Sequence, residues 1–234
     1  MTRDPAPGER LTVVCDLDGT LVDSAPDLSG ALNAVLAEQG ISTIPPGEIR
    51  NLVGDGALAL IRRALARSGT AERHDAGRLL ERFLDVYRSR LTRESRPYPG
   101  VHGALRALAR RGHPLAVCTN KPEDLARRML AELGLDHFGD AVVGGDTFAF
   151  RKPDRRTLEA AAERAGGDPE RSVLIGDSRT DVETARNADV PVILVSYGYR
   201  TDPIDDLAPD FVAHEFKEVV RLVRRLGRGG APAG

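Results

Sequence analysis

Two aspartates separated by one residue follow the first apolar segment of the chain. Residues 11–15 have the character of a short buried strand, and Asp16 and Asp18 come directly after it, before Gly19. Because strand side chains alternate between faces, both carboxylates leave the strand on the same side. Two like charges so close repel each other unless a cation or a shared proton lies between them. The pair therefore predicts a site for a cation or a shared proton, although the Asp-Gly turn of a β-hairpin is the structural alternative.

Three further polar groups each follow an apolar segment or the loop behind one. They are Thr119 with Asn120, Lys152, and Asp177 with Asp181. Taken singly, the first and third groups are also explained as helix caps, and the lysine as a solvated loop residue. Taken together they point to one site, because ligands of open α/β sheets bind beyond the carboxyl ends of the strands.

The residue types suit a phosphate ester bound beside Mg²⁺. Asp16, Asp18 and Asp177 offer the hard oxygen ligands that Mg²⁺ prefers. No cysteine or histidine joins them in a metal-ligand spacing, which argues against Zn²⁺. The Thr-Asn pair and Lys152 supply hydrogen-bond donors and one positive charge for a phosphate dianion.

A carboxylate nucleophile follows from this set of groups. An attacking carboxylate is repelled by a phosphate monoester, and a divalent cation with a lysine removes much of that repulsion. The attack forms an aspartyl-phosphate, which divides one difficult step into two. A second carboxylate nearby can protonate the leaving alcohol and then deprotonate water.

Lysine is scarce in this chain. Only Lys121, Lys152 and Lys217 occur among 33 basic residues. A compact ammonium acts as a point charge that a guanidinium fork does not imitate, so a retained lysine suggests a site that needs one. Lys217, on an expected surface helix, shows that chance alone also leaves a lysine.

The elements that must position these residues follow the pattern of an α/β fold. Strands are predicted at residues 11–15, 115–118, 141–143, 172–175, 192–195 and 210–213. Their alternation with helical segments predicts a doubly wound, Rossmann-like parallel sheet with helices on both faces.

A helical insertion interrupts this pattern after the first strand. Residues 24–92 show only helical periodicity, including one long helix at 72–91, and Ser24 is expected to cap the first helix. They predict an α-helical cap domain. The expected division is a catalytic core at 1–23 and 93–227, the cap at 24–92 and a disordered tail at 228–234.

Composition limits the class of protein. The chain has 234 residues and a net charge of −2, so no nucleic-acid or acidic-membrane partner is expected. No apolar run approaches the ~20 residues of a membrane span, and the first ten residues lack a signal-peptide core. A cytoplasmic protein, monomeric or homodimeric, is expected. Cys15 and Cys118 are interpreted as small buried hydrophobes.

The four polar groups, in this order, resemble the motifs of the haloacid dehalogenase-like hydrolases, which are mostly phosphatases. The match covers nearly the whole chain. It implies that Asp16 is the nucleophile and a metal ligand. It implies that Asp18 is the general acid and base, with its backbone carbonyl on the metal.

The same resemblance implies roles for the later groups. Thr119 and Asn120 would bind the phosphate, and Lys152 would balance charge on the nucleophile and the phosphate. Asp177 would be an Mg²⁺ ligand. Asp181 would hold the water of the metal or orient Lys152.

Three segments outside the motifs resemble the bacterial phosphoglycolate phosphatases of that superfamily: residues 52–57, 98–100 and 196–199. Gly54 and Gly56 would let the cap backbone approach a small substrate, with an ordinary turn between helices as the alternative. One departure is Asp189, where relatives usually carry glycine, and it should alter only a helix end.

The resemblance implies Mg²⁺-dependent hydrolysis of a small phosphate monoester, with 2-phosphoglycolate as the favoured substrate. A sugar-phosphate phosphatase or phosphomutase of the same superfamily is the alternative. The second aspartate, Asp18, argues against a true dehalogenase and against the phosphonate-cleaving relatives. A non-catalytic binding protein would not need the complete set of acids.

Overall fold

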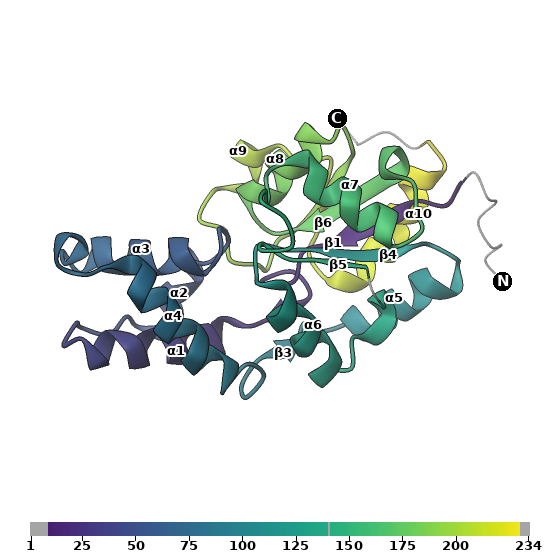
Figure 1. Ribbon diagram of the computed structural model, residues 1–234. Coiled ribbons are helices and arrows are strands. Elements are labelled where there is room, and N and C mark those ends of the chain that lie inside the picture. Colours follow the sequence, from purple (N-terminus) through teal and green to yellow (C-terminus); the bar gives the residue numbers. More distant parts are fainter. Residues whose placement is uncertain (1–8, 140, 230–234) are drawn as a thin grey trace.

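A six-stranded parallel sheet forms the centre of the computed structural model, which describes residues 9–139 and 141–229 (Figure 1). The strands, in spatial order, are β5 (Val142–Val143), β4 (Leu115–Cys118), β1 (Thr12–Cys15), β6 (Ser172–Gly176), β7 (Val192–Val195) and β8 (Phe211–Ala213). Val13 of β1 pairs with Leu115 on one side and Val173 on the other. The predicted doubly wound sheet is confirmed, and β1, which leads into the first aspartate pair, lies inside it.

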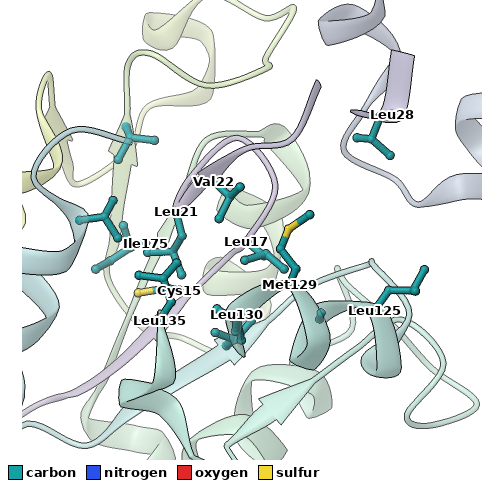
Figure 2. Packing of buried hydrophobic residues seen from close by; sticks show 14 of the residues in the cluster. Cys15, Leu17, Leu21, Val22, Leu28, Leu125, Met129, Leu130, Leu135 and Ile175 are labelled. Atoms are coloured by element: carbon teal, nitrogen blue, oxygen red, sulfur yellow. The ribbon is translucent and has the colours of Figure 1, made fainter. Parts of the chain in front are cut away.

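Helices cover both faces of this sheet. One layer contains α5 (Val101–Arg110), α6 (Glu123–Glu132) and α10 (Val219–Gly227), and the other contains α7 (Arg155–Arg164) and α8 (Arg179–Asn187). Val13 and Cys15 belong to the first hydrophobic cluster, which includes Met129 of α6 (Figure 2), whereas Val14 packs in the second. Burial on both faces explains why the residues of these strands are almost all apolar, apart from Thr12 and Ser172 at the starts of β1 and β6.

A separate group of helices lies beyond the edge of the sheet where the strands end (Figure 1). It comprises α1 (Ala25–Glu38), α2 (Pro46–Ile49), α3 (Ala57–Arg67) and α4 (Ala76–Arg88). These helices pack on one another through buried apolar side chains such as Leu32, Leu60 and Phe83. The predicted α-helical cap is therefore confirmed as part of the fold.

The prediction of one long helix over residues 72–91 is wrong in its bounds. A 3₁₀ turn occupies Ala71–Arg73, and α4 begins only at Ala76. Asp75 starts it, because its carboxylate accepts a hydrogen bond from the backbone N–H of Gly77 at 2.8 Å and so satisfies a free donor of the first turn.

The two chain crossings between cap and core lie side by side. Strands β2 (Val22–Asp23) and β3 (Arg96–Pro97) pair in an antiparallel ribbon. Asp27, at the start of α1, is fully buried and accepts hydrogen bonds from the backbone N–H and the hydroxyl of Ser95, at 2.8 and 2.7 Å. Both connections are thus tied together at one point, which the sequence patterns did not predict.

Two further expectations concern the ends of the chain and membranes. The expected tail, 228–234, lies outside the described residues from residue 230 onward; Arg228 and Gly229 form a turn after α10. Among the described residues, no helix combines the length and the apolar character needed to cross a bilayer. The boundaries between core and cap at residues 24 and 92 stay a prediction.

Candidate active site

The turn after β1 aims the first aspartates at the carboxyl edge of the sheet. Gly19 has φ +87°, and a Cβ atom there would lie 2.5 Å from a carboxylate oxygen of Asp177. Glycine is therefore required both for the backbone conformation and for the close approach of Asp177, which follows β6. The N–H of Gly19 donates to the carbonyl of Val22 at 2.9 Å, which closes the turn before the chain enters the cap.

Asp16 is buried and lies beside the ammonium of Lys152. The Nζ atom of Lys152 is 2.9 Å from Oδ1 of Asp16 and donates to Oδ1 of Asp181 at 2.6 Å. Burial raises the pKa of the Asp16 carboxyl to about 6, although Lys152 opposes this shift. Burial alone would lower the pKa of Lys152, but Asp16 and Asp181 outweigh it and the pKa is raised. Lys152 therefore stays positively charged next to the carboxylate.

Asp177 completes a cluster of buried acids. Ligand oxygens of Asp16, Asp177 and Asp181 lie within 4.8 Å of one another. Asp177 accepts hydrogen bonds from the hydroxyl of Thr20 and the N–H of Tyr199, both at 2.7 Å. Its pKa is raised to about 8, first by burial and then by the charges of Asp181 and Asp16. Without a cation these carboxylates destabilise one another.

The donor set of this cluster fits a hard divalent cation. All of its ligands are carboxylate oxygens, which suits Mg²⁺ or a similar ion and not Zn²⁺. Oδ1 of Asp16 is buried and has no hydrogen-bond partner among the described residues, since Lys152 lies close but outside hydrogen-bonding geometry. Asp181 is different, because its Oδ2 accepts from the N–H groups of Asp177 and Ser178, at 3.1 and 3.0 Å.

The carboxylate of Asp18 faces away from this cluster. It accepts a hydrogen bond from the hydroxyl of Ser24 at 2.5 Å and contacts Nζ of Lys121 at 2.9 and 3.1 Å. Ser24 therefore does not cap α1 with its side chain, contrary to expectation, because its hydroxyl is used by a charged acceptor. The two aspartates of the first motif thus have different surroundings, one among acids and the other beside a second ammonium.

Thr119 and Asn120 follow β4 and face the cap. The amide nitrogen of Asn120 lies 3.5 Å from the carbonyl of Gly54 in the loop before α3, while its buried Oδ1 has no partner among the described residues. A Cβ at Gly56 would lie 3.2 Å from the carbonyl oxygen of Asn120. The cap loop that carries both glycines therefore rests directly on the core loop after β4.

A small cavity lies between these core groups and the cap. It has about 40 Å³ of free space. Asp16, Asp18, Thr119, Asn120 and Lys121 line its core side, and the cap contributes Gly54, Gly56, Leu60, Phe83, Leu84 and Tyr87. One polar wall with two acids and one cation meets one mostly apolar wall, so the cavity suits a short, charged ligand.

Sequence reasoning assigned no role to several residues that the structure places here. Lys121 is 5% exposed and joins Asp18 to Tyr87 of the cap helix α4. Tyr199 donates its N–H to Asp177 and its hydroxyl to Asp23, at 2.7 Å each. The scarcity of lysine in the sequence had already suggested that a retained lysine such as Lys121 belongs to a site that needs an ammonium. No sequence signal indicated Tyr87, because an aromatic residue on a helix face is most often part of the core.

The remaining sequence expectations concern cysteines and a helix end. Cys15 and Cys118 are fully buried and free, and burial raises the pKa of the Cys118 thiol to about 11. They are inert small side chains of the core, as expected. Asp189 has φ +54°, so this non-glycine residue adopts the left-handed conformation just after α8.

Comparison with known proteins agrees with this arrangement. The family model described as haloacid dehalogenase-like hydrolase matches residues 13–195. A phosphoglycolate phosphatase of Agrobacterium fabrum is 46% identical over 222 residues, covering 94% of this chain and 95% of the relative. One from Caulobacter vibrioides is 46% identical over 209 residues, covering 89% and 88%.

A solved structure shows the same fold over nearly its full length. A predicted phosphoglycolate phosphatase from Haemophilus somnus superimposes with a TM-score of 0.85 at 30% identity, covering 92% of this chain and 98% of that one. The family model spans the segments that carry the aspartate pair, the Thr-Asn pair, Lys152 and Asp177. The chain belongs to the haloacid dehalogenase-like hydrolase family.

Proposed function

We propose that this protein is an Mg²⁺-dependent phosphatase of small phosphate monoesters, with 2-phosphoglycolate as its principal substrate. The observation that carries the proposal is the pairing of Asp16 with Lys152 at 2.9 Å, at the edge of a cavity closed by the cap. The identity of 46% to phosphoglycolate phosphatases over most of the chain supports the choice of substrate.

Asp16 acts as the nucleophile. Its carboxylate attacks phosphorus, the bond to the alcohol oxygen breaks, and an aspartyl-phosphate forms on Asp16. Lys152 lies close enough to offset charge on both Asp16 and the phosphate. Asp181 positions Lys152 through the 2.6 Å hydrogen bond, and is itself held by the backbone at the start of α8.

Asp18 acts as the general acid and base. Its carboxyl group protonates the departing alcohol oxygen, and its carboxylate then takes a proton from the water that hydrolyses the aspartyl-phosphate. Ser24 and Lys121 hold this carboxylate on the side of the cavity away from the acid cluster. A separate environment for each aspartate allows two carboxylates in one motif to perform different tasks.

Mg²⁺ would be held by Asp16, Asp177 and the backbone carbonyl of Asp18. When bound, it supplies positive charge that offsets the repulsion between the phosphate and the attacking carboxylate. Thr119 and Asn120 would donate hydrogen bonds to the phosphate. Gly54 and Gly56 bring the cap loop onto Asn120 and exclude bulk water from the reacting groups.

A phosphate-release screen over small phosphorylated acids and sugar phosphates, with Mg²⁺, tests the proposal. We expect release of inorganic phosphate, fastest from 2-phosphoglycolate. Failure to release phosphate from every compound would overturn the proposed phosphatase. Transfer of the phosphoryl group to a second hydroxyl of a sugar phosphate would instead identify the phosphomutase alternative. Release from sugar phosphates in preference to phosphorylated acids would overturn the proposed substrate.

A further inference from the structure

The contact between Lys121 and Tyr87 has no role in the chemistry proposed above. Among the described residues that line the cavity, Lys121 is the only cation. Its Nζ donates to the hydroxyl oxygen of Tyr87 at 2.6 Å and lies 4.6 Å from the centre of the tyrosine ring. Both side chains are almost fully buried, with 5% and 2% exposure. An ammonium held so far from water needs compensating negative charge, and the carboxylate of Asp18 lies beside it.

The pair retains donors for a further acceptor. Because the oxygen of Tyr87 accepts from Lys121, its own O–H proton remains available, and within the described residues no acceptor is present for it. Burial, with the charges of Asp18 and Asp27, raises the pKa of Tyr87, so the hydroxyl remains a donor. The neighbouring cap residues, Leu60 and Phe83, offer no polar group.

The order of groups along the cavity matches the order of groups in a short substrate. The phosphate must lie at Asp16, and the leaving oxygen must lie beside Asp18, which donates the proton to it. Lys121 contacts Asp18 at 2.9 Å, so it is the next charged group beyond the leaving oxygen. In 2-phosphoglycolate one carbon separates that oxygen from the carboxylate.

We infer that Lys121 and Tyr87 form the binding site for the carboxylate of the substrate and thereby determine the substrate selectivity of the protein. The inference rests on the proposed function and assigns a substrate-binding role to residues on both sides of the cavity. Lys121 supplies the ammonium from the core, and Tyr87 supplies a hydroxyl from α4. A carboxylate bound there adds a charge-assisted hydrogen bond between cap and core.

A purely structural role makes a different prediction. If Lys121 and Tyr87 serve only to position Asp18 or to close the cap, their loss lowers the turnover of every substrate by the same factor. Selectivity is therefore the decisive readout. The matched substrates are 2-phosphoglycolate and ethyl phosphate, which share the phosphate and two carbons and differ in the carboxylate.

The variants are Tyr87→Phe and Lys121→Met, with Lys217→Met as the control. We expect the ratio of kcat/KM for 2-phosphoglycolate to that for ethyl phosphate to fall about 10-fold in Y87F and about 100-fold in K121M. Lys217 is exposed and pairs with Glu215, far from the cavity lining, so K217M should preserve the ratio. Where ethyl phosphate reacts too slowly to time, its inhibition constant replaces kcat/KM.

An unchanged ratio in Y87F overturns the inference, whatever happens to the absolute rates. Y87F removes one oxygen and keeps the ring that packs on Phe83, so it tests the inference even if K121M fails to fold. Failure of the unaltered protein to release phosphate from either ester would instead overturn the proposed function, so the two failures are distinguishable.

Discussion

The core wall and the cap wall of the cavity are built on different physical principles. On the core wall each charged group has a charged partner, as Asp16 has in Lys152 behind it and Lys121 has in Asp18. On the cap wall the contacts are mostly apolar, and Tyr87 supplies the hydroxyl. In the proposed mechanism the core wall contains the groups that react, which need fixed electrostatics. The cap wall would exclude water from them. The proposed chemistry thus belongs to the core, whereas the proposed selectivity is shared between Lys121 of the core and Tyr87 of the cap.

Loss of the proposed nucleophile would be the strongest test of the core wall. We expect Asp16→Asn to lower kcat by about 10⁴-fold or more, because an amide forms no aspartyl-phosphate. The fold should persist, since the neutral amide removes like-charge repulsion from Asp177 and Asp181. Phosphate release and the thermal midpoint, measured on the same preparation, check both parts. A D16N rate equal to that of the unaltered protein would eliminate the mechanism.

The shape of the cation beside Asp16 is the next test of the core wall. Lys152 is 4% exposed between two carboxylates, where a guanidinium has no room to place its fork. We expect Lys152→Arg to lower kcat by about 10²- to 10³-fold. Lys217→Arg, at an exposed position, is the matched control and should retain full activity. If K152R works normally, charge alone is sufficient at this site.

Metal addition tests whether the acid cluster is a cation site. Mg²⁺ that binds only the folded state stabilises it, by about 2.7 kcal/mol at 100 times its dissociation constant. We therefore expect a higher thermal midpoint with MgCl₂ than with NaCl of equal ionic strength. Asp177→Asn removes one ligand and should abolish most of this difference. If MgCl₂ raises the thermal midpoint of D177N as much as that of the unaltered protein, Mg²⁺ binds elsewhere.

Disruption of the contact between the cap wall and the core wall is expected to have the smallest effect on the kinetics. Gly56 and Gly69 both lie in the cap with φ of +87° and +67°, but a Cβ at Gly56 would approach the carbonyl of Asn120 at 3.2 Å, whereas at Gly69 nothing lies within 4 Å. Alanine at Gly69 costs about 1 kcal/mol of backbone strain. Alanine at Gly56 costs about 1–3 kcal/mol, because its φ of +87° with ψ of 170° lies in a region that essentially only glycine adopts. We expect only Gly56→Ala to raise KM, by about 10-fold, because it separates cap from core. Equal kinetics for the two variants would show that this contact does not matter for substrate binding.

Much of the core was predictable because its pattern is local. Segments such as 115–118 and 173–175 are apolar at every position, which is typical of strands buried on both faces, and each is closely followed by polar residues. Parallel strands bring those polar residues to one edge. Asp16, Lys152, Asp177 and Asp181 are therefore close together, as the chain order and the strand pattern indicated.

Details of side-chain direction were less predictable. Ser24 occupies the N-cap position of α1 but donates to Asp18, and Asp75 starts α4 within the first turn of a segment expected to be continuous helix. In both cases the side chain has several possible hydrogen-bond partners nearby in the sequence. Which one is used depends on where the next element places its own polar groups.

The amino-acid sequence by itself determined the alternation of strands and helices, the inserted helical cap and the residue types of the acid cluster, because periodicity and chain order carry that information. Only the tertiary structure decided that Lys121 and Tyr87, 34 residues apart, meet above Asp18. That contact joins the cap to the core, and its geometry follows from how the cap and the core are oriented, which no local pattern encodes.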